Sequence, residues 1–279
     1  MSKCAPGYNS IDNSCFTLKQ LISISKKFNK SYPDHKFEIV NDKKYLLKKL
    51  NKNMKNKFGC SDELCWLDTK VLKSLKNEVH SAHRPKGPDG KYTWLSTTDI
   101  NKVLQQYENV YTDFKFLGAV PYDFNELDIL EIKNLNLDAF FKKYNKFGLV
   151  INLDEHWKSG SHWVALYGNI KKNQIYFFDS FGKKPRPKIR KYIRKILNHM
   201  YKKKYNKHIN FKSLSNNEFN KFDVRYNKKQ HQFKNSECGV YSINFIIRLL
   251  HDKESFSDIS NNILKDNFMN NCRNTYFRN

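Results

Sequence analysis

The sequence predicts an α+β fold in which a mixed central sheet is packed by helices. Short apolar runs at KFGLVINL, HWVALYGNI and NQIYFFDSF (146–153, 162–170 and 173–181) are typical of buried strands. The basic segment 185–205 is amphipathic, and the segment 238–250 is apolar on nearly every side, as a buried helix would be. Strands and helices that both carry apolar faces are expected to share one core between packed layers.

The N-terminal part has a different character. Residues 1–85 are expected to form a basic helical accessory domain, and residues 86–279 the main domain. Apolar side chains at three- and four-residue spacing predict helices in 16–28 and 43–58. The run HRPKGPDGK (83–91) is rich in Pro and Gly, so it interrupts regular structure and marks the boundary.

The elements of the main domain follow in order. The segment 93–111 opens with Thr, Ser and Asp capping residues and predicts a helix. The polar turn NIKKNQ joins the second and third strands. Proline near the start of 185–205 is tolerated in the first turn of a helix. HINFKSL (208–214) and KFDVRYNKK (221–229) are weaker strand predictions.

The chain carries a formal net charge of +24, which favours polyanionic partners. The densest basic clusters lie at 183–195 and 201–208, with more in 43–57. A non-specific nucleic acid is therefore one expected partner. The alternative is a solvated lysine-rich face without a ligand, and Lys and Asn are both abundant. No apolar run approaches the roughly 18 residues of a membrane span, and no secretory signal is recognisable, so we expect a protein that is not secreted.

The cysteines suggest neither export nor a metal. They are Cys4, Cys15, Cys60, Cys65, Cys238 and Cys272. Without export a disulfide framework is not the default, and ordinary reduced thiols are expected. Cys60 and Cys65 have the spacing of half a zinc site, but Cys4 and Cys15 are too far apart to supply the other half. We expect no metal and no cofactor.

Three residues combine the parts of a cysteine nucleophile. His162 opens a strand, Asp179 follows the next strand, and Cys238 begins the buried helix. A thiolate is stabilised at a helix N-terminus, where free N–H groups point outward. His162 would take the thiol proton and later donate it to a leaving amine, and Asp179 would orient the imidazole and stabilise its charged form.

The attack of a thiolate on a carbonyl also needs donors for the oxyanion. The N–H of Cys238 is one, and the side chain of Gln232 is the expected second; Gln230 is the alternative. Gly239 lets a substrate approach without a Cβ in the way. A second pair, His156-Trp157, lies in a polar stretch and ranks behind His162. Taken singly, a cysteine like Cys238 or a histidine like His162 is more often packed in a core than catalytic, and an aspartate like Asp179 more often forms a turn.

The strings HWVALYGN, FFDS and QFKNSECGVYSINF together resemble the SUMO- and ubiquitin-like-protein-specific cysteine protease family. WLSTTDI (94–100) resembles the segment with which the catalytic domain of that family opens. The resemblance covers roughly 92–250. The branch of large DNA viruses is the most similar, because there too a basic helical segment with a Cys-x4-Cys pair precedes the catalytic part.

The resemblance implies a papain-like fold of the ubiquitin-like-protease type. It places the catalytic histidine, acid, oxyanion glutamine and nucleophile on His162, Asp179, Gln232 and Cys238. It also places on Trp163 the indole that flanks a narrow substrate passage. Trp94, which opens the domain, and Gly239, beside the nucleophile, are the other expected substrate-binding residues.

The function that follows is cleavage of a protein substrate after small residues, Gly-Gly or Gly-x. By resemblance, the task is maturation of viral structural polyproteins, in the virion or the host cytoplasm. A ubiquitin-like-protein deconjugase and an acyltransferase are alternative enzymes. The non-enzymatic alternative is a basic nucleic-acid-binding virion protein without turnover.

Overall fold

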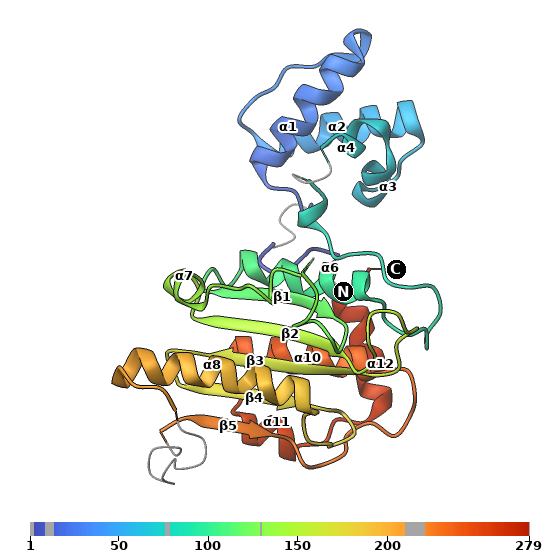
Figure 1. Cartoon of the computed structure of the whole chain (residues 1–279). Helices are drawn as coiled ribbons and strands as arrows, with labels where there is room; N and C mark the ends of the chain where they lie inside the picture. Colours follow the sequence, from blue (N-terminus) through green and yellow to red (C-terminus); the bar gives the residue numbers. More distant parts are fainter. Residues whose placement is uncertain (1–2, 9–13, 76–78, 129, 210–220, 279) are drawn as a thin grey trace. The chain divides into compact units, whose positions relative to one another are not determined.

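The computed structural model describes residues 3–8, 14–75, 79–128, 130–209 and 221–278 (Figure 1). Contacts divide the chain into two compact units. We call Met1–Pro85 with Arg278 the N-terminal unit, and Lys86–Phe277 the sheet unit. Each has a hydrophobic core of its own.

The N-terminal unit is helical. Its described elements are α1 (Leu18–Ser31), η1 (Pro33–His35), α2 (Lys43–Phe58), α3 (Glu63–Asp68), α4 (Lys70–Lys73) and η2 (His80–Ala82). Thr17 and Gln20 form a capping box that starts α1, satisfying N–H groups that the first turn leaves free. Helix α2 ends at Gly59, whose φ of 70° is a conformation that glycine adopts at little cost.

Two disulfides cross-link this unit, Cys4–Cys15 and Cys60–Cys65, so the prediction of reduced thiols there was wrong. Cys4 is placed by a β-bridge to His83, a residue far along the chain, and spacing alone cannot reveal such a pairing. Cys60 precedes α3 and Cys65 lies in its first turn. The two are bonded to each other, which excludes them from a zinc site in this state. Cys238 and Cys272 carry free thiols.

The sheet unit contains a five-stranded mixed sheet in the order β1-β2-β3-β4-β5 (Figure 1). The strands are β1 (Phe114–Val120), β2 (Lys146–Asn152), β3 (Trp163–Asn169), β4 (Gln174–Phe178) and β5 (Asp223–Tyr226). The two outer pairs are parallel and the two inner pairs antiparallel. The sequence analysis missed β1, whose pairing register shifts between Phe116 and Ala119 and whose inward and outward positions do not alternate cleanly. The predicted strand at 208–214 falls mostly on residues outside the described ones.

Helices cover both faces of the sheet. One face packs against α6 (Thr97–Gln105), η3 (Gln106–Asn109), α10 (Cys238–His251), α11 (Phe256–Asn261) and α12 (Asp266–Tyr276). The other packs against α7 (Leu137–Lys143) and α8 (Pro187–Tyr205), and Figure 1 shows α8 in front of the sheet with α10 behind it. The predicted α+β class with a mixed sheet between helices is confirmed.

Local sequence explains where these helices begin and end. Ser96 and Asp99 form the capping box of α6. Pro187 is the first residue of α8, where a backbone N–H would have no acceptor within the helix, so its absence in proline costs nothing. Asn206 and Asp252 end α8 and α10 in the left-handed conformation. Within the described part of the chain, no helix has both the length and the apolarity to cross a membrane.

Candidate active site

His162 and Asp179 meet because they flank neighbouring antiparallel strands. His162 directly precedes β3, and Asp179 directly follows β4, so both lie at the same end of the sheet. His162 Nε2 and Asp179 Oδ1 are 2.7 Å apart, and both side chains are buried. A hydrogen bond of this length to a carboxylate holds the imidazole in one orientation.

Asp179 is itself held by a buried residue that the sequence analysis did not identify. Asn227 accepts the Asp179 N–H at 2.8 Å and donates to the Asp179 carbonyl at 2.7 Å. The Phe181 N–H donates to Asp179 Oδ1 at 2.8 Å. Asn227 follows directly after β5, the strand beside β4, so a polar residue at the end of a predicted strand was the available signal.

Cys238 is the first residue of α10 and is 4% exposed. Its N–H is one of the four that an α-helix leaves without an intrahelical acceptor, so positive partial charge gathers around the sulfur. Burial lowers the pKa of His162, but the hydrogen bond to Asp179 and the hydrogen bond and charge of Cys238 outweigh it and raise that pKa to about 9. At neutral pH the imidazole beside the thiol is therefore protonated.

Gln232 is buried in the loop before α10, and its amide has a fixed orientation. Oε1 accepts a hydrogen bond from Ser180 Oγ at 2.6 Å, and Nε2 donates to the Lys234 carbonyl at 2.6 Å. An amide nitrogen carries two hydrogens, so Nε2 has a second one beyond this bond. Gln230, in contrast, is exposed, and its amide donates to the Gln232 carbonyl. Ser180 directly follows Asp179, and the sequence analysis assigned it no role.

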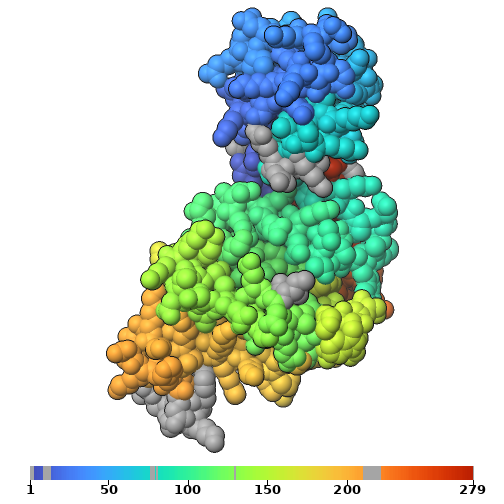
Figure 2. All heavy atoms as spheres, turned by 45° about the horizontal axis from the view of Figure 1, so that its top comes forward, coloured from blue at the N-terminus to red at the C-terminus, as the bar shows by residue number. Residues whose placement is uncertain are grey.

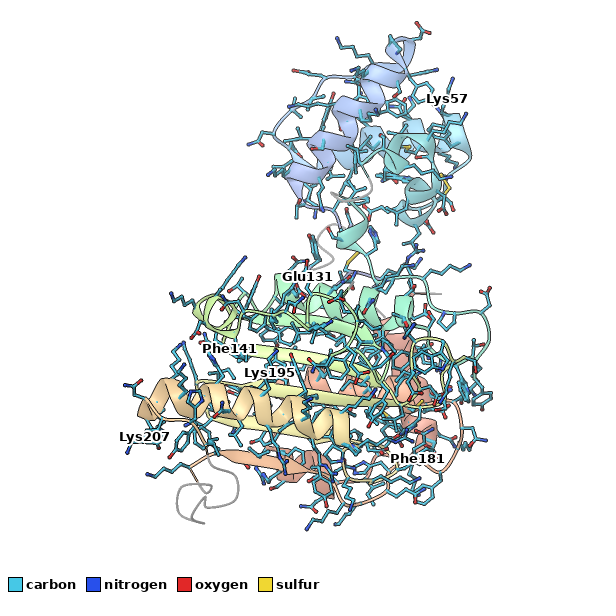
Figure 3. The ribbon with its side chains drawn as sticks, in the orientation of Figure 1. Lys57, Glu131, Phe141, Phe181, Lys195 and Lys207 are labelled. Atoms are coloured by element: carbon cyan, nitrogen blue, oxygen red, sulfur yellow. A yellow bond between two sulfur atoms is a disulfide. The ribbon has the colours of Figure 1, made fainter. Side chains whose placement is uncertain are left out.

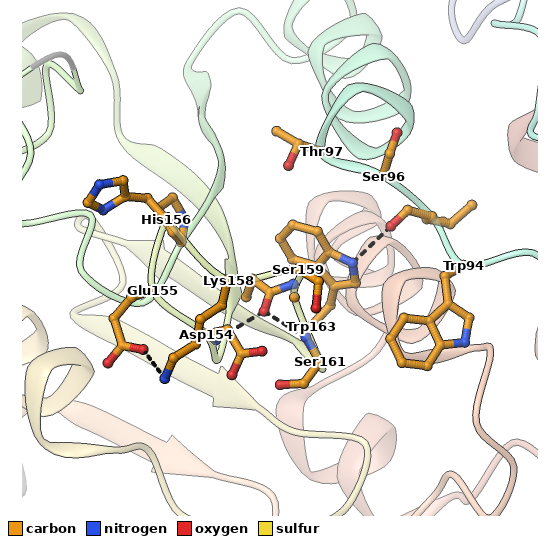
Figure 4. A pocket seen from close by; sticks show the side chains of 14 residues that line it. Trp94, Ser96, Thr97, Asp154, Glu155, His156, Lys158, Ser159, Ser161 and Trp163 are labelled. Carbon is orange, nitrogen blue, oxygen red and sulfur yellow. Dashed lines mark hydrogen bonds and ion pairs between the residues drawn. The ribbon is translucent and has the colours of Figure 1, made fainter.

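Trp94 and Trp163, the tryptophans expected to bind substrate, line one cleft of ≈ 460 Å³. Trp163 is buried, and its Nε1 donates to the Leu95 carbonyl at 2.9 Å, which fixes the indole. Trp94 is 49% exposed. In Figure 4 the two indoles lie toward one end of the cleft, and Glu155 and His156 toward the other.

Gly239 contacts the protein itself. A Cβ on this residue would lie 3.0 Å from the Leu95 Cβ, tighter than ordinary packing allows. The glycine thus lets the segment leading into α6 approach the start of α10. A direct contact between Gly239 and substrate stays a prediction.

The second histidine also has a carboxylate partner. His156 Nδ1 lies 2.6 Å from Asp123 Oδ2, and the His156 side chain is half exposed. Among the described residues the free thiols are those of Cys238 and Cys272. Cys238 interacts with His162 and raises its pKa, so His162 is the histidine beside this thiol. His156 instead lines the cleft that contains the two tryptophans.

A second cavity of ≈ 450 Å³ borders His162 and Asp179. Phe181, labelled in Figure 3, stacks on the His162 ring with centroids 4.5 Å apart and covers one face of it. The other lining includes Lys183, Lys184 and Arg186, so this cavity is basic. The first cleft is lined by charges of both signs, Asp154, Glu155 and Lys158, and the last two form an ion pair at 2.7 Å.

Comparison with known proteins identifies the family of this chain. Residues 70–279 match the Ulp1 protease family, C-terminal catalytic domain. A protein of Acanthamoeba polyphaga mimivirus that carries the name thiol protease is 36% identical over 100% of this chain and 94% of its own length. A SUMO-1 cysteine protease of African swine fever virus is 24% identical over 92% of this chain and 99% of its own.

A solved structure supports the fold over the whole chain. The crystal structure of the African swine fever virus pS273R protease superposes with a TM-score of 0.66 at 19% identity, covering 99% of this chain and 96% of that one. The family match covers the sheet unit, including His162, Asp179 and Cys238. This chain belongs to the Ulp1 protease family and is a cysteine protease.

Proposed function

We propose that Cys238 is the nucleophile of an endopeptidase, that His162 is its acid–base group, and that Asp179 orients and charges His162. The observation that carries this assignment is the 2.7 Å bond from His162 to Asp179, together with the raised pKa that Cys238 and Asp179 give to His162. A helix N-terminus and a neighbouring imidazolium are the surroundings that activate a cysteine nucleophile.

The chemistry follows from these positions. The Cys238 sulfur, whose proton is held by His162, attacks the scissile carbonyl carbon as a thiolate. The Cys238 N–H and the second hydrogen of Gln232 Nε2 stabilise the oxyanion. His162 then gives its proton to the leaving amine as the C–N bond breaks, and water hydrolyses the thioester in the second half of the reaction.

The substrate of this proposal is a polyprotein cut after Gly-Gly or Gly-x. Trp163 is held by its bond to Leu95, so its indole cannot swing aside to admit a large side chain. Trp94 adds an exposed aromatic surface in the same cleft. Backbone without side chains suits such a passage. The resemblance of the sequence motifs to the branch of large DNA viruses is our reason for proposing structural polyproteins, cut during maturation in the virion or the host cytoplasm.

The test is incubation of the full-length protein with candidate structural polyproteins, followed by N-terminal sequencing of the fragments. New N-termini directly after Gly-Gly or Gly-x are expected. Cys238→Ala and His162→Ala should release none, whereas Cys272→Ala, which removes the other free thiol, and His156→Ala should release most. Cleavage by Cys238→Ala, or equal loss in His156→Ala and His162→Ala, would reject the assignment.

A deconjugase is the second candidate, because the African swine fever virus relative carries the name SUMO-1 cysteine protease. The catalytic residues would be the same, and only the substrate would differ. Parallel assays on SUMO and ubiquitin precursors and on the polyproteins separate the two. Faster turnover of a ubiquitin-like precursor would favour the deconjugase.

The N-terminal unit is proposed to assist the recognition of large substrates. The described catalytic candidates all lie in the sheet unit. A variant that starts at Lys86 should keep activity on a short peptide and lose it on a polyprotein. Equal loss on both substrates would show instead that the unit is needed for folding.

A further inference from the structure

Four potential metal ligands meet inside the N-terminal unit, away from the proposed catalytic residues in sequence. The Cys15 sulfur, a carboxylate oxygen of Glu63 and a ring nitrogen of His83 lie within 4.8 Å of one another. The Cys4 sulfur is bonded to that of Cys15 and completes the group. All four residues belong to this one unit.

Contacts other than the disulfide hold these residues in place. Cys4 forms a β-bridge with His83, and the Cys4 carbonyl accepts Arg84 Nε at 3.1 Å. Glu63 Oε2 accepts the Cys15 N–H at 3.1 Å and lies 3.3 Å from His83 Nε2. The donors would therefore stay close together after the sulfur–sulfur bond is broken.

The Glu63 carboxylate supplies a second, independent observation. Its side chain is 13% exposed, and its Oε1 is buried without a hydrogen-bond partner among the described residues. A buried carboxylate oxygen without a hydrogen-bond partner is unfavourable, because it has lost its contacts with water. A cation bound between Glu63 and the sulfurs would remove that cost.

We propose that Cys4, Cys15, Glu63 and His83 bind a zinc ion when the Cys4–Cys15 disulfide is reduced. Two thiolates, one imidazole and one carboxylate make a four-coordinate set of the ligand types that zinc selects. With all four positions supplied by protein, the site is structural. The N-terminal unit is then cross-linked by a disulfide in oxidising surroundings and by zinc in reducing ones.

The change from the disulfide to the zinc-bound form conserves electrons and protons. A dithiol reductant gives two electrons to the disulfide, which becomes two thiols, and the reductant becomes a disulfide. Zinc then displaces the two thiol protons as it binds the sulfurs. Reoxidation by a disulfide reagent removes two electrons from the two thiolates as their sulfurs bond to each other, and the reagent becomes a dithiol. The ion is released because the sulfurs of the disulfide no longer carry negative charge.

The other cysteine pair of the unit is the competing site, and the structure disfavours it. In the parts of the chain that the structure describes, no second group of three His, Cys, Asp or Glu side chains converges to hold an ion. Cys60 and Cys65 thus lack the further ligands that a closed site needs. They provide the matched control.

The experiment titrates Co²⁺, and then Zn²⁺ in competition, into the full-length protein that has been reduced with a phosphine or left oxidised. The reduced protein should bind about one ion per chain and show the thiolate-to-cobalt charge-transfer and d–d bands of a tetrahedral site. The oxidised protein should show neither band. Absence of the bands in the reduced protein would overturn the proposal.

Variants locate the site. Cys15→Ser should abolish the charge-transfer band, and Glu63→Gln, which keeps the side-chain shape, should weaken zinc binding about tenfold or more. The double variant Cys60→Ser/Cys65→Ser should bind as wild type, and so should Cys238→Ala, which removes the proposed nucleophile as a competing ligand. Binding retained by Cys15→Ser, or lost in either control, would contradict the assignment.

Discussion

Replacing Asp179 by Asn tests how far one carboxylate sets the charge of His162. The pKa of His162 is raised from 6.5 to about 9, and at about 1.4 kcal/mol per unit this rise is worth about 3 kcal/mol. His162 is only 8% exposed, so solvent screens the interaction little. A hydrogen bond to a charged partner is more stabilising than one to a neutral partner by about 1–2 kcal/mol. Asparagine should therefore lower the His162 pKa by about one unit.

The assay is the pH dependence of kcat/KM on a short peptide. The leaving amine needs a proton from the imidazolium, so activity should fall as pH rises through about 9 in the wild-type protein. In Asp179→Asn this alkaline limb should move to lower pH by about one unit, with a loss of about tenfold or more in kcat/KM at neutral pH. An unchanged alkaline limb would refute the reasoning.

The free energy of unfolding gives a second readout, because the direction in which it changes with pH is determined by the raised pKa of His162. Because the pKa of His162 is raised on folding, its contribution to the free energy of unfolding is complete below about 6.5, the value in the unfolded chain. That contribution is lost as pH rises through about 9. The loss should be smaller in Asp179→Asn. Asp123→Asn is the matched control, because Asp123 bonds the half-exposed His156 at 2.6 Å and should leave the His162 titration unchanged.

Three further predictions concern other parts of the sheet unit. Gln232→Ala should lower kcat about 100- to 1,000-fold with little change in melting temperature, and Gln230→Ala should have a small effect; the reverse order would move the oxyanion donor to Gln230. Gly239→Ala should lower the free energy of unfolding by about 1–3 kcal/mol in denaturant titration, since its Cβ would crowd Leu95. Helix α8, whose residues are orange in Figure 2, carries exposed lysines and should bind random duplex DNA, with log affinity falling linearly in log salt. Charge reversal at Lys191 should reduce that slope, and no binding at low salt would leave these lysines as a solvated surface.

Most strands and helices were predictable from local pattern, and each exception has a physical cause. Helix α2 begins and ends where the sequence analysis placed it, because Asp42 caps its start and Gly59 ends it. Strand β1 was missed, since its register shift spoils the alternation by which a strand is recognised. The Cys4–Cys15 bond was missed because it depends on a bridge between residues 4 and 83, which are far apart in the chain.

The sequence by itself determined the class of fold and the chemical types at the candidate site. Residue patterns place a histidine before one strand, an acid after the next and a cysteine at a helix start, and these are properties of neighbours along the chain. Only the tertiary structure decided which atoms approach each other. Both His156 and His162 pair with an aspartate, but the partner of His162 is Asp179, which follows β4 and is held by Asn227. Likewise Gln232 rather than Gln230 is buried against Ser180. Such contacts arise from packing between elements, and no local sequence pattern encodes the distance between two side chains on different strands.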